Sequence, residues 1–201
     1  QLIKIGEVLG QSIVQVGRET DFRITGPTKL HGTAVTNPSK NGALGLLCAS
    51  LINHGTTTLH NIPQIEEVAR LIEIFQSIGI SVERVGHTLK IRVPEQLSLQ
   101  TMNITAAKKI RSILMMIGGL MHREKRISIP HAGGCNMGER TIVAHKHALQ
   151  SFGINTKTLD SEYSITRTKL KPAEIIMYEA SDTATINALI TAACIPGKTV
   201  I

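Results

Sequence analysis

The sequence predicts an α/β fold built from a repeated unit of strand, helix, strand, helix and two further strands. Apolar or amphipathic stretches of helical length alternate with short β-branched runs, a pattern typical of mixed α/β architecture. The same order of elements returns after roughly 70 residues. Gln-Ser-Ile-Gly at 76–79 reappears as Gln-Ser-Phe-Gly at 150–153, and Ile-Pro at 62–63 reappears at 129–130. We therefore expect two complete copies and the beginning of a third.

The chain opens with a stretch that we interpret as an N-terminal extension, residues 1–21. Its apolar positions have only loose helical spacing, because Gly6, Gly10 and Gly17 interrupt them. Short strands are predicted at 22–24 and 30–36. The first copy then continues with a helix at 41–52, a strand at 56–59, an amphipathic helix at 65–78 and a hairpin of strands at 81–84 and 88–93. Gly79 follows the second helix, as expected of a glycine that ends a helix.

The second copy repeats this order and adds one loop. Its predicted elements are a helix at 111–121, a strand at 126–129, a helix at 141–152 and strands at 155–159 and 163–167. A third copy begins with a helix at 184–195 and stops within a strand at Ile201. Between Pro130 and its second helix, the second copy holds a longer, glycine-rich loop at 131–140 that contains Cys135. An insertion in one copy of a repeat usually marks a functional segment.

Composition narrows the classes of function. Hydrophobic residues make up 42% of the chain and aromatic residues only 2%, so the core must be aliphatic. The scarcity of aromatic rings argues against binding of single-stranded nucleic acid, and no apolar run approaches the ~18 residues of a membrane span. A net charge of +7 without a block of basic residues favours small anionic ligands. The three cysteines form no CxxC pair, which argues against a structural zinc site and favours a reduced, cytoplasmic protein.

The loop cysteine has two interpretations from its pattern alone. Glycines around Cys135 let the backbone bend around a ligand. Arg140 and the start of the helix predicted at 141 would favour its thiolate. The alternative is a loop cysteine without a role. Cys48 and Cys194 lie on apolar predicted helices, so both are expected to pack in the core.

Cations at equivalent helix starts suggest an anion site. Lys40 and Asn41 begin the first helix of the first copy, and Arg111 begins the matching helix of the second. Backbone N–H groups at a helix start attract anions, and equivalent helices of a repeat can face one cleft. Lys40, Arg111 and Arg140 could therefore converge on one polyanion. The alternative is a solvated lysine beside a helix cap.

These residues match a known family. From about Phe22 to Ile201 the chain resembles the UDP-N-acetylglucosamine enolpyruvyl transferase (1-carboxyvinyltransferase) family, in its N-terminal half. The residues that carry the resemblance are Gly26-Pro27-Thr28-Lys29-Leu30, Ser39-Lys40-Asn41, Arg111, Gly133-Gly134-Cys135 with Gly138 and Arg140, His145 and Ser181.

The resemblance implies a fold and a reaction. Residues 22–201 would form most of an inside-out α/β barrel domain built from repeated βαβαββ units, and a second domain, missing from this sequence, would complete the active site. The family transfers the enolpyruvyl group of phosphoenolpyruvate to the 3′-hydroxyl of UDP-N-acetylglucosamine and releases phosphate. This is the first committed step of peptidoglycan synthesis, a target of fosfomycin and needed for the cell wall, cell shape and cell division. The expected partners are these small molecules and the second domain, without nucleic acid, membrane, metal or cofactor. One domain alone is expected to be inactive.

The resemblance also assigns roles. Cys135 would act as the general acid, with Lys40 and Arg140 as catalytic cations that bind phosphoenolpyruvate together with Asn41. The nucleotide-sugar site would be lined by Asn41, Arg111, Arg140, Thr141, Ile142, Val143, Ala144, Glu179, Ala180, Ser181, Asp182 and Thr183.

Several positions depart from the family pattern. Thr141 replaces the usual proline, Val143 replaces an acidic residue, and Glu179 replaces a lysine. Asp182 and Thr183 stand where valine and glycine are common. Two added carboxylates would repel a diphosphate. A divergent enzyme with another acceptor, or a non-catalytic half-enzyme that only binds ligand, therefore remain alternatives.

Overall fold

The computed structural model describes residues 31–131 and 142–201. Residues 1–37 and 38–201 form two separate units. In the first unit the described residues, 31–37, are exposed and form no helix or strand. The strand predicted at 30–36 is therefore wrong over its described part, because a strand needs a neighbour to which its backbone can bond. The strand predicted at 22–24 and the extension at 1–21 lie outside the described residues.

From its first helix onward, the first copy of the repeat has the predicted order of elements. It consists of α2 (Lys40–Ala49) with a 3₁₀ helix at Ser50–Ile52, β1 (Thr56–Leu59), α3 (Glu66–Ser77), β2 (Ser81–Val85) and β3 (Thr88–Arg92). The strands form an antiparallel sheet in the order β1-β3-β2. Along β3, the buried residues Leu89 and Ile91 alternate with exposed ones, so one face of the sheet packs inward.

The second copy repeats this architecture. A 3₁₀ helix at Arg111–Met115 leads into α5 (Met116–Arg123), followed by β4 (Arg126–Pro130), α6 (Val143–Gln150), β5 (Ile154–Thr158) and β6 (Glu162–Arg167). Its sheet has the matching order β4-β6-β5, again antiparallel. The third copy begins with α7 (Asp182–Ala192) and a single parallel bridge between Glu174 and Val200. The predicted repeat is thus confirmed from the first helix of each copy onward, whereas no opening strand is present at 31–37 or at 93–110.

Matching glycines end the matching helices. Gly79 after α3 and Gly153 after α6 both have φ of +92°, a conformation that glycine adopts without steric cost. Their N–H groups donate to Gln76 and Gln150, the first residues of the two recurring segments. The segments that recur at 76–79 and 150–153 therefore form the same type of helix ending in both copies.

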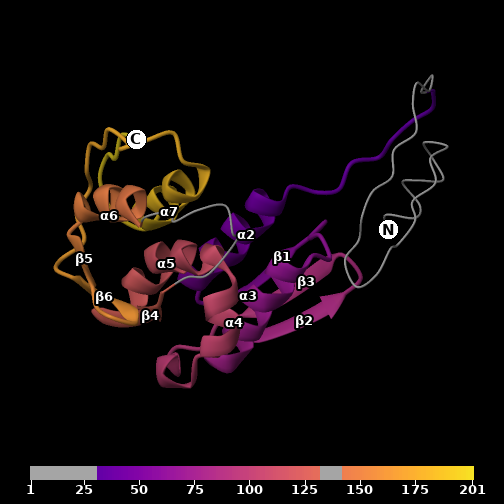
Figure 1. The fold of residues 1–201 in the computed structure, drawn as a ribbon, viewed down its shortest axis with the longest axis horizontal. Helices are drawn as coiled ribbons and strands as arrows, with labels where there is room; N and C mark the ends of the chain where they lie inside the picture. Colours follow the sequence, from indigo (N-terminus) through magenta and orange to yellow (C-terminus); the bar gives the residue numbers. More distant parts are fainter. Residues whose placement is uncertain (1–30, 132–141) are drawn as a thin grey trace. The chain divides into compact units, whose positions relative to one another are not determined.

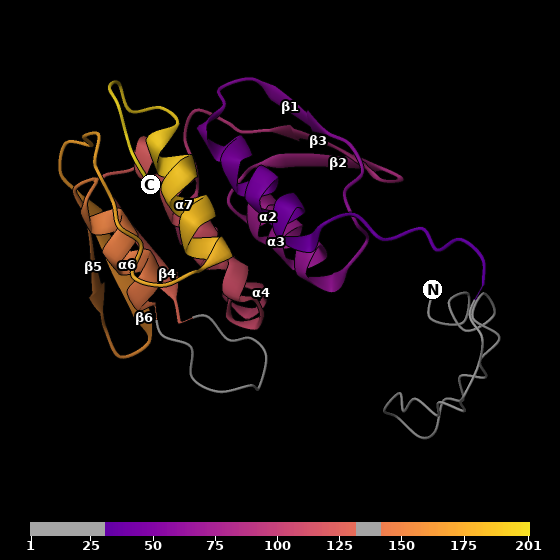
Figure 2. The same cartoon turned by 90° about the horizontal axis from the view of Figure 1, so that it is seen from above.

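The core lies between the two sheets and is built from both helices of the first two copies and from α7 of the third (Figures 1 and 2). Helix α5 contacts α2 on one side and α7 on the other, and α2 also contacts α7. Two glycines make this close approach possible. A Cβ at Gly118 would lie 2.7 Å from the backbone oxygen of Asn187, and one at Gly119 would lie 2.8 Å from Cβ of Leu51. No other residue type fits between these helices without displacing them.

Two further expectations need correction. The short helix α4 (Ile104–Lys109) was not predicted, although Asn103 caps it by accepting from the N–H of Ala106 at 3.0 Å. Six residues give too little periodicity to stand out. Cys194 was expected in the core, but α7 ends at Ala192 and Cys194 is exposed. Cys48 is buried as predicted. Within 31–131 and 142–201, no helix has the length and apolar character to cross a membrane.

Candidate functional site

The N-termini of α2 and α7 meet, which joins the first and third copies of the repeat. Each helix is capped by a serine. Ser39 Oγ accepts from the N–H of Gly42 at 3.1 Å, and Ser181 Oγ accepts from the N–H of Ala184 at 3.4 Å. Asn41 Nδ2 of α2 donates to Asp182 Oδ2 of α7 at 3.4 Å. Residues 141 positions apart in sequence are therefore neighbours at this junction, where two helix dipoles place partial positive charge.

Lys40 stands at the same junction in an ion pair. Its Nζ lies 2.9 Å from Oε2 of Glu67, on the first turn of α3, and its side chain is 54% exposed. An ion pair this exposed contributes about 0–1 kcal/mol. Separating Lys40 from Glu67 would therefore cost little free energy.

Arg111 and His145 bring the second copy to the junction. His145 on α6 is only 2% exposed, and its Nε2 lies 3.3 Å from Oγ1 of Thr183 on α7. Burial, with the positive charge of Arg111 as the second cause, lowers the pKa of His145 to about 4. Arg111, half-buried at the start of its 3₁₀ helix, is thus close enough to act on a side chain that contacts α7. Residues from all three copies meet here.

The remaining predicted residues fall into two groups. Cys135, Arg140 and Thr141 lie outside the described residues. Ile142 and Ala144 are buried, whereas Val143, Glu179 and Ala180 are exposed. Any contact of Ile142 or Ala144 with a ligand would therefore involve the backbone at the start of α6.

One residue of this junction was missed by sequence reasoning. Asn187 is fully buried on α7, and its amide bonds Gly118, Leu114 and His145. The available signal was the single carboxamide among the apolar residues 186–190 of α7, because a buried amide requires hydrogen-bond partners.

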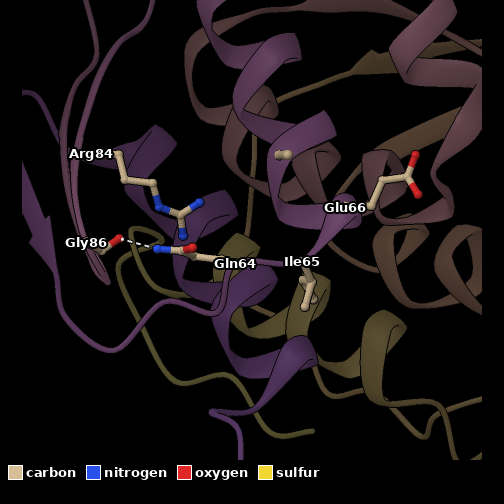
Figure 3. A pocket seen from close by; sticks show the side chains of 6 residues that line it. Gln64, Ile65, Glu66, Arg84 and Gly86 are labelled. Atoms are coloured by element: carbon tan, nitrogen blue, oxygen red, sulfur yellow. Dashed lines mark hydrogen bonds between the residues drawn. The ribbon is translucent and has the colours of Figure 1, made fainter. Parts of the chain in front are cut away.

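A separate cavity of about 450 Å³ lies at the start of α3 (Figure 3). It is lined by Gln64, Ile65, Glu66, Ala69, Arg84 and Gly86. Gln64 Nε2 donates to the carbonyl of Gly86 at 3.2 Å, and Arg84 Nη2 donates to the carbonyls of Ile62 and Pro63. These bonds tie the loop before α3 to the β2–β3 hairpin. None of the lining residues belongs to the predicted site.

Metal-ligating side chains do not gather anywhere in the part of the chain that the structure describes, since no group of three or more His, Cys, Asp or Glu side chains is suitably placed. His145 and His147 are both on α6, but His147 Nε2 lies 3.0 Å from the carbonyl of Ile176, away from the bonds of His145.

Comparisons with known proteins all match this chain to 1-carboxyvinyltransferases. Residues 24–201 match the family of EPSP synthase (3-phosphoshikimate 1-carboxyvinyltransferase). A UDP-N-acetylglucosamine 1-carboxyvinyltransferase of Elusimicrobium minutum is 32% identical over 180 residues, which are 90% of this chain and 42% of the relative. The enzyme of the same name from Treponema pallidum is 33% identical over 183 residues, with coverage of 90% and 42%. This chain thus spans less than half the length of the curated relatives that it matches.

Solved structures agree on the fold. The enolpyruvyl transferase NikO from Streptomyces tendae superposes with a TM-score of 0.63 at 21% identity, covering 80% of this chain and 38% of NikO. EPSP synthase from Acinetobacter baumannii gives a TM-score of 0.62 at 17% identity, covering 84% and 39%. At these identities the likeness concerns architecture, and it confirms the predicted enolpyruvyl transferase fold for this part of the barrel.

Proposed function

Because the chain belongs to the EPSP synthase family, we propose that the complete protein transfers the enolpyruvyl group of phosphoenolpyruvate to the 3′-hydroxyl of UDP-N-acetylglucosamine and releases phosphate. The acceptor is the one named in the matching curated relatives. The observation that carries the proposal is the junction of α2 and α7, where Asn41 donates to Asp182 and the neighbouring Lys40 is paired with Glu67 of α3. Two helix N-termini, together with a lysine whose carboxylate partner Glu67 a ligand can displace, suit a phosphorylated substrate.

The proposed chemistry needs cations and one acid. Lys40 and Arg140 would hold the phosphate and carboxylate of phosphoenolpyruvate, with Asn41 beside both substrates. Cys135 would protonate the methylene carbon while the sugar hydroxyl adds to the neighbouring carbon and loses its proton to a base. The tetrahedral intermediate then expels phosphate and loses a proton from its methyl group, which restores the double bond. Fixed cations stabilise the charge that develops on the phosphate.

The same proposal covers the rest of the protein. Residues 22–201 would be most of one domain, and a second domain would supply the opposite wall of the active site. We assign the reaction to peptidoglycan synthesis in the cytoplasm, where both substrates occur. Residues 1–201 alone would be inactive without that second domain.

A second candidate keeps the reaction and changes the acceptor. Asp182 places a carboxylate at the start of α7, within hydrogen-bonding distance of Asn41, and Glu179 is exposed three residues earlier. These charges oppose a diphosphate. An acceptor that carries less negative charge at this position would fit them better.

Phosphate release tests both candidates. The complete protein, mixed with phosphoenolpyruvate and UDP-N-acetylglucosamine, should release phosphate in step with loss of phosphoenolpyruvate. Lys40→Ala should raise the KM for phosphoenolpyruvate at least tenfold, because a lost charged hydrogen bond costs about 1.5–3 kcal/mol. Lys90→Ala, an exposed lysine on β3, is the matched control. Release with a different acceptor, and none with UDP-N-acetylglucosamine, would establish the second candidate.

A further inference from the structure

A buried chain of side chains runs from α5 to the start of α7. Asn187 Oδ1 accepts from the N–H of Gly118 at 2.8 Å, and Asn187 Nδ2 donates to the carbonyl of Leu114 at 2.8 Å. Asn187 Nδ2 also lies 3.1 Å from Nδ1 of His145, and Nε2 of His145 lies 3.3 Å from Oγ1 of Thr183. Asn187 and His145 are buried, while Thr183 is half-buried.

The backbone of α5 fixes the orientation of Asn187. If its amide were rotated by 180°, the NH₂ group would face the N–H of Gly118, and the oxygen would face the carbonyl of Leu114. The first contact pairs two donors and the second pairs two acceptors. Both are buried, so the rotated state would leave polar groups without partners at a cost of about 1–3 kcal/mol each. Nδ2 must therefore point at His145.

The orientation of Asn187 in turn fixes the proton on His145. Because Nδ2 of Asn187 is a donor, Nδ1 of His145 has to accept and carries no proton. The neutral ring then holds its proton on Nε2 and donates it to Oγ1 of Thr183. Burial, with the charge of Arg111 as the second cause, lowers the pKa of His145 to about 4, so the ring is neutral near pH 7.

A hydroxyl that accepts from His145 has its own proton left to donate. Thr183 is on the first turn of α7, next to Asp182, whose carboxylate accepts from Asn41 across the junction. The hydroxyl proton is therefore not used on the histidine ring, and Thr183 lies at the junction where the phosphorylated substrates are proposed to bind. Glycine, the residue common at this position in the family that the chain resembles, cannot supply such a donor.

We propose that His145 is a positioning residue, which directs the Thr183 hydroxyl to donate a hydrogen bond to an oxygen atom of the nucleotide sugar. Asn187 holds His145 in the required tautomer, and the α5 backbone holds Asn187. This proposal rests on the proposed function, because it uses the same acceptor.

The test removes the hydroxyl while keeping the shape of the side chain. Thr183→Val in the complete protein should weaken binding of UDP-N-acetylglucosamine, measured by calorimetry, about tenfold, as expected for one lost hydrogen bond to a ligand. Thr183→Ser should restore binding to within about twofold of the wild type. Thr185→Val is the matched control on the same helix, because the Thr185 hydroxyl already donates to the carbonyl of Ser181 at 2.8 Å.

A second measurement tests the role of His145 directly. Nitrogen-15 NMR of the histidine rings should show the His145 proton on Nε2 and none on Nδ1 at pH 7. In Thr183→Val the Nε2 signal should shift, whereas in Thr185→Val it should not. A proton on Nδ1, or equal affinities of wild type and Thr183→Val, would overturn the proposal.

The assays also separate this proposal from the proposed function. Phosphate release by the wild type together with unchanged affinity in Thr183→Val would sustain the function and reject the role of Thr183. Tight binding that depends on the Thr183 hydroxyl, without phosphate release, would reject the function and sustain the binding role. A wild type that does not bind UDP-N-acetylglucosamine would reject both.

Discussion

At the scale of single residues, His145 shows how burial keeps a titratable ring neutral and holds it in one orientation. The ring is 2% exposed and bonded at both nitrogens, to Asn187 and to Thr183. Protonation would place a second donor against Nδ2 of Asn187 and a charge beside Arg111. Both effects favour the neutral ring, in agreement with its lowered pKa.

The stability of the protein should therefore fall in mild acid. The pKa of His145 is about 4 in the folded protein, against an ordinary histidine value of 6.5, so the unfolded chain binds the extra proton first. The contribution of His145 is complete above pH 6.5 and is lost as the pH falls towards 4, by up to about 3 kcal/mol. Urea unfolding at about pH 7 and about pH 4.5 measures this difference.

The matched variants for this measurement are His145→Gln and His54→Gln. His145→Gln should shrink the difference in unfolding free energy between the two pH values by about 2–3 kcal/mol. His54 is exposed, so replacing it should leave the difference unchanged. An equal pH dependence of the unfolding free energy in wild type and His145→Gln would show that protonation of His145 does not destabilise the folded protein.

The cysteines should differ sharply in reactivity. Burial raises the pKa of the Cys48 thiol, and the thiol has no access to solvent, so it should resist alkylation in the folded protein. Fosfomycin should label Cys135, whereas a maleimide should also label exposed Cys194. Mass spectrometry of the digested protein locates each adduct. Cys135→Ser should abolish the fosfomycin adduct; equal labelling of this variant, or an adduct on Cys48 before unfolding, would contradict the assignment.

At the scale of elements, the contact of α5 with α7 depends on Gly118. A Cβ there would lie 2.7 Å from each of three oxygen atoms: the backbone and side-chain oxygens of Asn187 and Oγ1 of Thr191. Gly118→Ala should lower the unfolding free energy by about 1–3 kcal/mol, since overpacking outweighs the better helix propensity of alanine. Urea unfolding measures the loss.

Gly55→Ala is the control for this prediction. A Cβ at Gly55 would approach no atom closer than 3.6 Å, so its effect should be within about 0.5 kcal/mol. If both variants unfolded with the same free energy, α5 and α7 would have room to separate.

Sequence patterns predicted the regular elements well where a local signal existed. Strand β1 has its predicted bounds, and α3 lies within the predicted helix, because an apolar face and a closing glycine mark it. The wrong predictions concern residues whose structure depends on tertiary contacts. Residues 31–36 include three β-branched residues but pair with no strand among the described residues, and Cys194 lies just beyond α7. Residue propensities predict neither whether a strand finds a partner nor where a helix ends relative to the core.

At the scale of the whole molecule, the repeat predicted part of the site. Equivalent helix starts were expected to lie near one another, and the starts of α2 and α7 are neighbours through Asn41 and Asp182, whereas the convergence of Lys40, Arg111 and Arg140 on one anion stays a prediction. The ion pair of Lys40 with Glu67 and the bonds of Asn187 depend on side-chain positions that no spacing encodes. The assignments of Cys135 and Arg140 remain predictions, because they lie outside the described residues.

The meeting of α2 with α7 also sets an order of folding. The β2–β3 and β5–β6 hairpins close over few residues, whereas Asn41 and Asp182 are 141 positions apart. Closing so long a loop carries a larger entropic cost and is slower. On the ribosome, α2 and α5 emerge first and expose their apolar faces until α7 follows. A nascent chain interrupted before α7 would thus leave the apolar faces of α2 and α5 uncovered, and exposed apolar surface is what chaperones and proteases recognise.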